Sequence, residues 1–501
     1  MNDKVFILNP HYHLKHDIHR VILFSRGKDD ENCSYQWHTF IHPLQAAMLS
    51  FFTYNRPYRE TITLLCDFFC RSREDMERWV SKFIENPSPV YTHSAEGKIH
   101  FPKRVLIDAS RWKEAFHYRE LDIHSFACKT IDLTTRRLFS RPSLVTFMLT
   151  NRCVTHCLYC YADTTTPVIH PLPTSRILSL IEEAERLQVQ QIGLMGGEIF
   201  LHPDWQQILY ELVKRDIAPD VISTKMPMTS KLINQLEATG YQGILQVSLD
   251  SCNERIAQET LGVKEGYVSQ MLEGIRLLDE STLNYQIASV LTTYNCDITT
   301  LSEMYIQIAN LKRIRDWRIV PVHNSITKEF HSFAKLKPSK GKIIDVNERL
   351  REIIKKPSFP IIIGVSALEI HYNQATDGSC SFKGKKCSAL NTHLFILPDG
   401  KATICEQLYW NPHFIVGDVS TSGIQEVWLS DRAKKLYNMQ RDDLQSDTVC
   451  RDCALFESCF SYHNRCWTDI IKAYGRDCWD YPDPRCQFAP PMKNKLDYEQ
   501  K

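Results

Sequence analysis

The sequence has almost no net charge and no long apolar segment. Its 60 Lys and Arg residues balance 59 Asp and Glu residues, which leaves a formal charge of +1. This balance argues against nucleic acid or an anionic membrane surface as the partner. No apolar run approaches the length of a transmembrane helix, and residues 1–10 lack the basic and apolar regions of a secretory signal. We therefore expect a cytoplasmic protein with no membrane and no nucleic-acid partner.

The sequence also lacks internal repeats and low-complexity tracts. Its 501 residues exceed the length of one domain, and 43% hydrophobic residues are enough for several cores. What it has in abundance is cysteine, with 18 in the chain. In a reducing compartment these are not expected to form disulfides, so their spacing decides between metal sites and buried thiols. Eleven of them form two groups, one within residues 153–160 and one within residues 380–486, where Cys478 is left over as a spare thiol.

Residues 1–100 alternate between short strands and amphipathic helices. Apolar residues recur at helical spacing in three segments, and Pro87 and Pro89 end the third. The pattern predicts a small winged-helix-like α+β domain. The predicted elements are the strands Arg20–Ser25 and Tyr35–Phe40, the helices Pro43–Phe52, Arg59–Cys70 and Ser72–Ile84, and a hairpin near Val90–Phe101.

In residues 142–330, strands alternate with helices, which is typical of a parallel α/β sheet or barrel. Active residues of such folds lie at the carboxyl ends of the strands. The strands are too few for a closed barrel of eight units, so we predict an α/β fold with a partial (β/α)6 barrel. The predicted strands are Leu144–Leu149, Ile192–Met195, Val221–Ser223, Ile244–Leu249, Gln286–Leu291 and Trp317–Val320.

The first cysteine group has the spacing C-x3-C-x2-C directly after a predicted strand, with Cys153, Cys157 and Cys160. Three thiolates on one tight loop can bind three irons of a [4Fe–4S] cluster and leave the fourth iron open to a chelating ligand. The alternative is zinc, which usually takes a fourth protein ligand, and His156 is not placed to be one. This spacing, with Tyr159 before the last cysteine, resembles the radical S-adenosylmethionine (SAM) superfamily.

A second motif agrees with that resemblance. Met195-Gly196-Gly197-Glu198 looks like the Gly-Gly-Glu motif that follows the second strand in the superfamily. The resemblance implies that the two glycines let the backbone approach a ligand and that Glu198 pairs with the methionyl ammonium of SAM. Ile199 stands where the family usually has proline.

Two further strand ends resemble the family's SAM contacts. Ser223 and Lys225 lie where the ribose and the carboxylate are bound, although asparagine is commoner than Lys225. By the same resemblance Ser248 and Asp250 face the ribose, and Val320 lies near the adenine through its backbone. Capping of strand ends is the alternative interpretation of these residues.

The resemblance also implies a reaction. The open iron chelates SAM, and one electron arrives from a flavodoxin or ferredoxin-type reductant. SAM then gives methionine and a 5′-deoxyadenosyl radical, which removes a hydrogen atom from the substrate. Cysteines that ligate this cluster are therefore catalytic as well as metal-binding.

The second cysteine group resembles the SPASM domain of peptide-modifying radical SAM enzymes, which holds two auxiliary [4Fe–4S] clusters. The family usually has three residues before the fourth cysteine of this run, but six separate Cys459 and Cys466. His463 stands at the usual position, and we favour Cys466 because thiolate suits iron better than imidazole. Two zinc sites are the alternative. Carried across by position, the ligands are Cys380, Cys387, Cys405 and Cys466 for the first cluster, and Cys450, Cys453, Cys459 and Cys486 for the second.

The N-terminal pattern resembles the leader-peptide recognition element of ribosomal peptide maturases, a winged helix that binds an extended leader as an added strand. Winged helices also bind DNA, but this one is not basic enough to favour it. The resemblances assign 1–100 to leader binding, 101–141 to a linker, 142–330 to the radical SAM barrel, 331–379 to a bridging segment and 380–490 to the SPASM domain.

Together these features predict a radical SAM oxidoreductase that modifies a ribosomally synthesised precursor peptide through its leader. The expected products are thioether or carbon–carbon crosslinks. Alternatives within enzymes are a protein maturase of the anaerobic sulfatase-maturing type and a peptide epimerase. The alternative outside enzymes is a metal-binding electron-transfer or scaffold protein, which the open-iron cysteine loop argues against.

Overall fold

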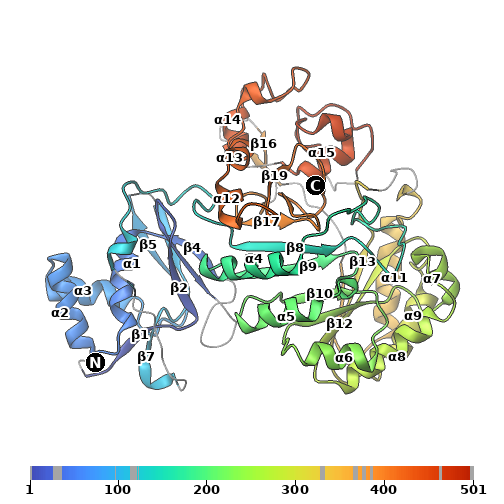
Figure 1. Cartoon of the computed structure of the whole chain (residues 1–501), viewed down its shortest axis with the longest axis horizontal. Helices are drawn as coiled ribbons and strands as arrows, with labels where there is room; N and C mark the ends of the chain where they lie inside the picture. The colour runs from blue at the N-terminus through green and yellow to red at the C-terminus, as the bar shows by residue number, and fades with distance from the viewer. Residues whose placement is uncertain are drawn as a thin grey trace. The chain divides into compact units, whose positions relative to one another are not determined.

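The structure is a computed structural model with two compact units, Met1–Ser140 and Arg141–Lys501 (Figure 1). Among its described residues, no helix is long and apolar enough to cross a membrane. The residues described are 3–25, 37–95, 97–112, 121, 123–327, 333–364, 387–461 and 465–496, with 371–374 and 380–383 as backbone only.

The first unit combines a three-stranded antiparallel sheet, in the order β2-β3-β4, with three helices and a β5-β6 hairpin. The three helices and the hairpin lie where they are predicted, but the first helix ends at Ser50 rather than at Phe52 and the third at Ser81 rather than at Ile84. Its elements are β1 Phe6–Leu8, β2 Tyr12–His16, β3 Val21–Ser25, β4 His38–Ile41, α1 Pro43–Ser50, α2 Tyr58–Phe69, α3 Arg73–Ser81, β5 Val90–Ser94, β6 Gly97–Phe101 and β7 Leu106–Asp108.

Local chemistry explains these elements. All five residues of β3 are buried, as expected of the central strand of a sheet covered on both faces. Helix α2 buries one face, which includes Ile62 and Leu65. Helix α3 begins after Ser72, whose side chain accepts a hydrogen bond from the backbone N–H of Asp75.

The first unit extends beyond residue 100, so the predicted linker is largely part of it. Strand β7 pairs antiparallel with β1. The fully buried guanidinium of Arg20 pairs with Asp17 at 3.0 Å and donates to the backbone carbonyls of Thr135 and Arg137. Asp17 in turn accepts hydrogen bonds from the backbone and side chain of Ser140. These bonds fix residues 132–140 onto the unit.

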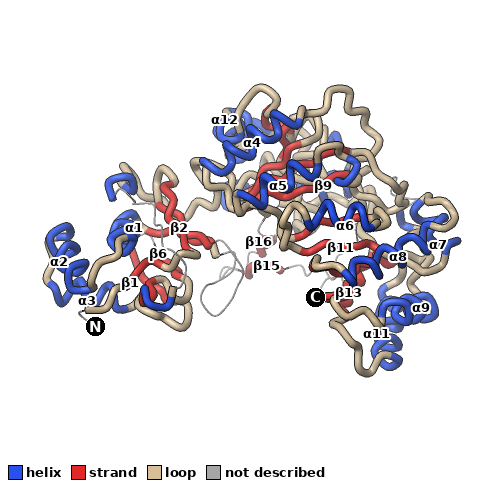
Figure 2. Tube along the Cα trace, turned by 60° about the horizontal axis from the view of Figure 1, so that its bottom comes forward, coloured by secondary structure: helices blue, strands red, loops and turns tan. Residues whose placement is uncertain are grey.

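The second unit contains the predicted barrel, and all six predicted strands are present. Strands β10 to β14 form one parallel sheet and β8 and β9 pair in parallel in another. Helices form an outer layer against these strands (Figure 2). The elements are β8 Leu144–Thr150, α4 Thr174–Arg186, β9 Gln191–Gly196, α5 Trp205–Lys214, β10 Val221–Thr224, α6 Ser230–Glu237, β11 Ile244–Ser248, α7 Glu254–Leu261, α8 Tyr267–Glu280, β12 Asn284–Leu291, α9 Ile298–Ile308, β13 Ile314–Pro321, α11 Lys340–Ile353 and β14 Ile361–Ile363.

The predicted bridging segment contributes to the barrel. It supplies α11 and β14, and β14 pairs in parallel with β13 as a further strand of the sheet. The cysteine-rich region also joins the barrel, because its strand β17 pairs in parallel with β8. Its elements are β15 His371–Gln374, β16 Cys380–Lys383, β17 His393–Ile396, β18 Lys401–Thr403, β19 Ile415–Asp418, α12 Ile424–Leu429, α13 Asp431–Tyr437, α14 Phe456–Ser461 and α15 Trp467–Tyr474.

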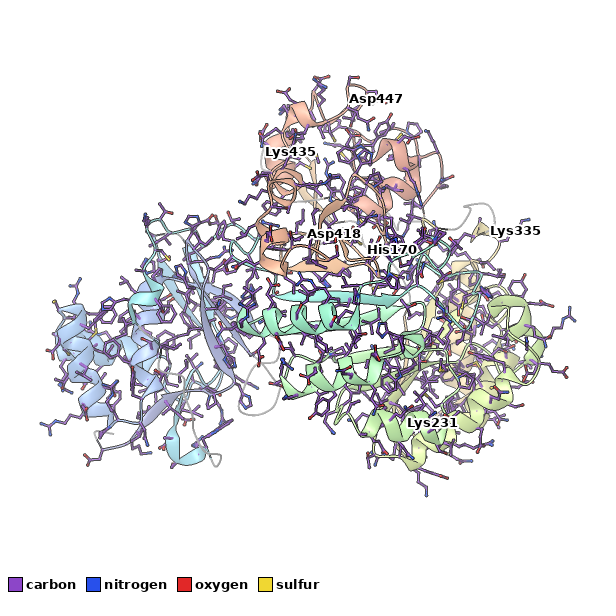
Figure 3. The ribbon with its side chains drawn as sticks, viewed as in Figure 1. His170, Lys231, Lys335, Asp418, Lys435 and Asp447 are labelled. Carbon is purple, nitrogen blue, oxygen red and sulfur yellow. The ribbon has the colours of Figure 1, made fainter. Side chains whose placement is uncertain are left out.

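Charged side chains of both signs lie on the outside of the second unit. Figure 3 shows Lys231 on the helical layer of the barrel, and Lys435 and Asp447 on the cysteine-rich region. All three are exposed. The near-zero net charge therefore reflects mixed surface charge rather than an uncharged surface.

Candidate functional site

The cysteine loop leaves the carboxyl end of β8 and is held by the end of helix α7. The backbone N–H of His156 donates to the carbonyl of Leu261 at 2.7 Å, and that of Leu158 donates to Thr260 at 2.9 Å. Helix α7 ends at Gly262, which has a φ of +65° and lies close to His156. The loop is thus fixed by backbone bonds that do not depend on a bound ligand.

The three cysteines of this loop lie on adjacent turns. Cys160 donates its backbone N–H to the carbonyl of Cys157, and Cys157 is buried. The hydroxyl of Thr155 lies 3.5 Å from the sulfur of Cys153 and 3.2 Å from that of Cys157. Burial raises the pKa of the Cys157 thiol, while the charge of Lys225 lowers it. Sequence analysis missed Thr155, which belongs to no recognised motif.

The two glycines of the Gly-Gly-Glu motif pack directly against this loop. Gly197 donates its backbone N–H to the carbonyl of Thr150, and Glu198 donates to that of Arg152. A β-carbon on Gly197 would lie 2.2 Å from the Arg152 carbonyl oxygen, and one on Gly196 would lie 2.5 Å from that of Thr150. In the described structure, the glycines therefore allow the backbone of residues 150–152, where the cysteine loop begins, to approach this closely.

Glu198 is 2% exposed and its carboxylate is already well supplied with donors. It accepts hydrogen bonds from the Thr224 hydroxyl at 2.8 Å and from the backbone N–H of Lys225 at 3.1 Å. Burial raises the pKa of Glu198, and the hydrogen bond from Thr224 opposes that shift. These contacts fix the carboxylate at the ends of β9 and β10, beside the cysteine loop.

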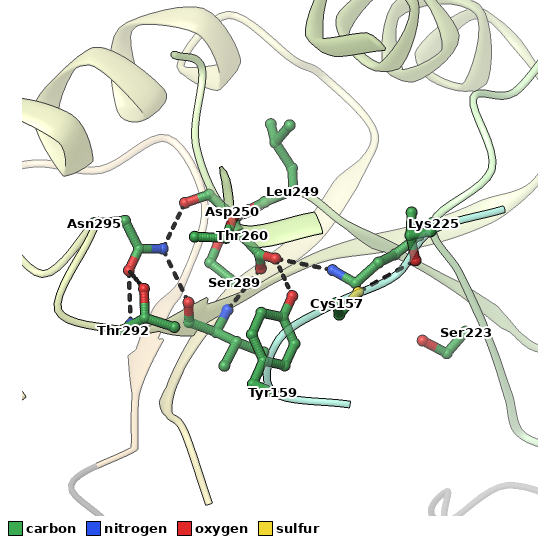
Figure 4. A network of polar contacts seen from close by, with 12 residues as sticks. Cys157, Tyr159, Ser223, Lys225, Leu249, Asp250, Thr260, Ser289, Thr292 and Asn295 are labelled. Atoms are coloured by element: carbon green, nitrogen blue, oxygen red, sulfur yellow. Dashed lines mark hydrogen bonds and ion pairs between the residues drawn. The ribbon is translucent and has the colours of Figure 1, made fainter. Parts of the chain in front are cut away.

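Asp250 is the centre of a buried polar network (Figure 4). Its carboxylate pairs with the Lys225 ammonium at 2.9 Å and accepts hydrogen bonds from the Tyr159 hydroxyl and, at 2.8 Å, from the Val290 backbone N–H. Burial opposes the charge of Lys225, but Asp250 and the nearby Cys157 and Cys160 leave its pKa raised. Asn295, which sequence analysis missed, donates to the carbonyl of Asp250 at 2.7 Å.

The structure thus brings Tyr159, Lys225 and Asp250 together, but it leaves Ser223 outside. Ser223 is exposed and its hydroxyl accepts a hydrogen bond from Gln246, and Figure 4 shows it apart from the network. Ser248 is half-buried at the end of β11.

Two other groups of cysteines assemble in the C-terminal region. Cys387 lies close enough to Cys405 and Cys466 to act electrostatically on both. Burial, with smaller contributions from neighbouring acidic groups, raises the pKa of Cys405 to about 11. Cys380 lies in β16, but its side chain is outside the described residues, as is the whole of His463.

The second group contains the other four predicted ligands. Burial raises the pKa of Cys459 to about 11, Arg465 opposes this, and three neighbouring cysteines add to it. Those neighbours are Cys450, Cys453 and Cys486, so the four side chains lie near enough to act electrostatically on one another.

The donors have the chemistry of iron–sulfur cluster ligands, since such clusters are held by cysteine thiolates. Within the described ranges, no three His, Cys, Asp or Glu side chains converge as the ligands of one ion would. In a [4Fe–4S] cluster each thiolate binds a different iron, so convergence on one point is not required. Binding would displace the protons that these buried thiols otherwise retain.

Comparison with known proteins agrees with these sites. Family models match the chain as the radical SAM superfamily over residues 147–297 and as the SPASM iron–sulfur cluster-binding domain over residues 387–454. Mycofactocin maturase MftC of Mycobacterium tuberculosis is 22% identical over 69% of this chain and 83% of its own. The subtilosin biosynthesis protein AlbA of Bacillus subtilis is 25% identical over 32% of this chain and 35% of its own.

Solved structures extend the likeness to the whole chain. Streptococcus suis SuiB bound to S-adenosylmethionine covers 96% of this chain and 100% of its own, with a TM-score of 0.59 and 13% identity. A second SuiB structure, with a TM-score of 0.58, is bound to its precursor peptide SuiA. At this identity the likeness establishes the fold.

Proposed function

The chain is a radical SAM protein with a SPASM domain, and we propose that it modifies a ribosomally synthesised precursor peptide. Both domains bind [4Fe–4S] clusters, and the first also binds SAM. The observation that carries the proposal is the cysteine loop, with Cys157 buried, packed against Gly197 and Glu198, and with Lys225 and Asp250 beside it. One relative named as a mycofactocin maturase and another named as a biosynthesis protein of the bacteriocin subtilosin support a peptide as substrate.

The residues of the barrel have separate tasks in this proposal. Cys153, Cys157 and Cys160 hold the cluster, which with SAM supplies a carbon radical able to remove hydrogen from the substrate. Glu198 receives the methionyl ammonium of SAM. Lys225 is already charged and directed toward the cysteine loop, so it suits the SAM carboxylate. Ser223 and Ser248 are proposed ribose contacts.

Asp250 has a different proposed role from the direct ribose contact that the sequence predicts. Its carboxylate is occupied by Lys225, Tyr159 and Val290. We propose that it holds the Lys225 ammonium and the Tyr159 ring in place beside the cysteine loop, since fixed partners would reduce the reorganisation needed when SAM binds.

The eight cysteines of the C-terminal region are proposed ligands of two auxiliary clusters. The first takes Cys380, Cys387, Cys405 and Cys466, and Cys466 is preferred to His463 because its buried thiol already lies near Cys387. These clusters accept the electron that crosslinking releases, or hold a substrate thiolate. An external flavodoxin or ferredoxin supplies the first electron, and the protein acts as an oxidoreductase in the cytoplasm.

The first unit is the proposed leader-binding module. Its sheet has β2 and β4 at the edges, and the α2–α3 pair and the β5-β6 hairpin complete a winged-helix order. A disordered leader can add a strand at such an edge through main-chain hydrogen bonds. The SuiB–SuiA structure supports a peptide partner for a chain of this fold.

The test is anaerobic co-expression with a short peptide encoded beside the gene, followed by mass spectrometry. A loss of two hydrogens per modification is expected for a crosslink. An unchanged mass with deuterium incorporated from deuterated water indicates epimerisation. If SAM is cleaved but no adjacent peptide changes, the precursor-peptide proposal is wrong and protein maturation takes its place.

A matched pair of cysteine variants controls this experiment. Cys157 and Cys252 pack in the same apolar cluster, but only Cys157 lies in the cysteine loop. Cys157→Ala is expected to abolish modification, whereas Cys252→Ala keeps it. Equal loss in both variants would indicate a packing effect rather than loss of a cluster ligand.

A further inference from the structure

Arg465 is a buried arginine beside the second group of C-terminal cysteines. Arg465 is only 7% exposed. The guanidinium Nη2 donates to the sulfur of Cys450 over 3.6 Å, and the guanidinium carbon lies 5.0 Å from the ring centroid of Trp467. Its positive charge also acts on Cys459, which favours the thiolate there. A buried cation therefore faces two sulfurs of one proposed cluster site.

The position of Arg465 follows from the unusual spacing in this region. It is the last of the six residues between Cys459 and Cys466. Cys466 precedes helix α15 and donates its backbone N–H to Asp483 at 2.9 Å. This anchors the backbone next to Arg465, so one segment supplies a proposed ligand of the first auxiliary cluster and a cation for the second.

The charge has a predictable effect on an iron–sulfur cluster. Reduction adds one negative charge to the cluster and its sulfurs, and hydrogen bonds to the sulfurs help to set the reduction potential. A nearby cation stabilises the reduced form more than the oxidised form, and burial protects the interaction from screening by salt. Arginine stays protonated throughout, so this effect does not depend on pH.

We infer that Arg465 raises the reduction potential of the cluster held by Cys450, Cys453, Cys459 and Cys486 and makes that cluster the preferred acceptor of the electron released in crosslinking. The inference rests on the proposed function. When a crosslink forms, the peptide loses one hydrogen atom to the deoxyadenosyl radical. It then loses one proton to solvent and one electron, which reduces one oxidised auxiliary cluster. Arg465 touches no reacting atom and is a positioning residue.

The test is a redox titration of the full-length holoenzyme, followed by electron paramagnetic resonance. In Arg465→Gln the ratio of reduced to oxidised second cluster, at a fixed potential, is expected to fall about tenfold, which corresponds to 59 mV for a one-electron couple. Arg465→Lys keeps the charge but not the planar donor, so a smaller fall of about threefold is expected. The other auxiliary cluster is expected to change less than twofold in both variants.

Arg441 provides the matched control. It is an arginine of the same region that pairs with Glu457, donates to the backbone carbonyls of Arg451 and Cys453, and is 34% exposed. Arg441→Gln is expected to change the ratio less than about twofold, because solvent screens its charge. An equal change in the Arg441 and Arg465 variants would overturn the inference.

Iron content separates failure of this inference from failure of the proposed function. Wild-type protein with about eight irons rather than about twelve lacks one auxiliary cluster, and both proposals then fail. With about twelve irons and an unchanged ratio in Arg465→Gln, only the inference about Arg465 fails. If Arg465→Gln does not retain its iron, Arg465→Lys decides, and an unchanged ratio in that variant overturns the inference.

Discussion

Replacing Gly197 by alanine tests whether the glycines of the Gly-Gly-Glu motif exist to admit the cysteine loop. The added β-carbon would lie 2.2 Å from the carbonyl oxygen of Arg152, 2.6 Å from its carbonyl carbon and 2.7 Å from the carbonyl oxygen of Asn151. All three atoms are backbone atoms, so no side chain can rotate away. Even a contact of 3.0 Å requires the loop to retreat by at least 0.8 Å, the difference between 3.0 and 2.2 Å.

This displacement acts directly on the proposed cluster ligands, because Arg152 precedes Cys153. A misplacement of about 1 Å can cost roughly a hundredfold in rate. We therefore expect Gly197→Ala to lower the rate of SAM cleavage by between tenfold and a hundredfold. The assay is 5′-deoxyadenosine formation under anaerobic conditions with dithionite, alongside the iron content of the same sample.

Gly193 is the matched control on the same strand. Its added β-carbon would approach the Thr146 hydroxyl at 2.8 Å, and this side chain can rotate. Gly193→Ala is expected to stay within about threefold of the wild-type rate. Only the half-buried hydrogen bond of the Thr146 hydroxyl, worth about 1 kcal/mol, is disturbed. Wild-type SAM cleavage with full iron content in Gly197→Ala would refute the steric argument.

Two further predictions concern stability. Arg20→Met leaves Asp17 as an uncompensated buried charge and is expected to destabilise the first unit by about 3–5 kcal/mol. Lys4→Met breaks the exposed pair with Asp108 and is expected to cost less than about 1 kcal/mol. Urea unfolding followed by proteolysis within residues 1–140 measures both variants, and equal effects would contradict the reasoning. Burial lowers the pKa of His393 to about 4, so between about pH 6.5 and 4 the unfolded chain binds a proton that the folded chain does not. The free energy of unfolding of the second unit is thus expected to decrease as the pH is lowered from about 6.5 to 4, by up to about 3 kcal/mol. His393→Gln should flatten that slope in pH-dependent unfolding curves.

Local patterns were sufficient to predict the barrel and the cysteine loop. Each barrel strand is a short apolar run at the start of a strand–helix unit, so its burial is readable from neighbouring residues. The prediction of Leu144–Leu149 differs from β8 by one residue. The cysteine loop is equally local, because all three cysteines lie within one turn-rich segment.

Contacts between distant segments could not be predicted. Strand β1 has three residues and pairs with β7 about a hundred positions away. Both strands are too short for an alternating hydrophobic pattern to be detected in the sequence. Arg20 binds backbone carbonyls of residues 132–137, and a carbonyl carries no residue identity in the sequence. For the same reason Asn295, which bonds the backbone carbonyls of Asp250 and Val290, left no recognisable motif.

The pairing of β17 with β8 shows why these long-range contacts matter for function. Strand β8 ends in the cysteine loop, and β17 leads through Leu397 toward Cys405. Their parallel register, from His393 beside Leu144 to Ile396 beside Phe147, places both sets of cysteines at ends of one sheet. A shift of two residues along this ladder would move the two sets by about 6.6 Å relative to one another. Backbone hydrogen bonds between β8 and β17, together with those between β17 and β18, therefore hold the cysteine loop and Cys405 to one sheet.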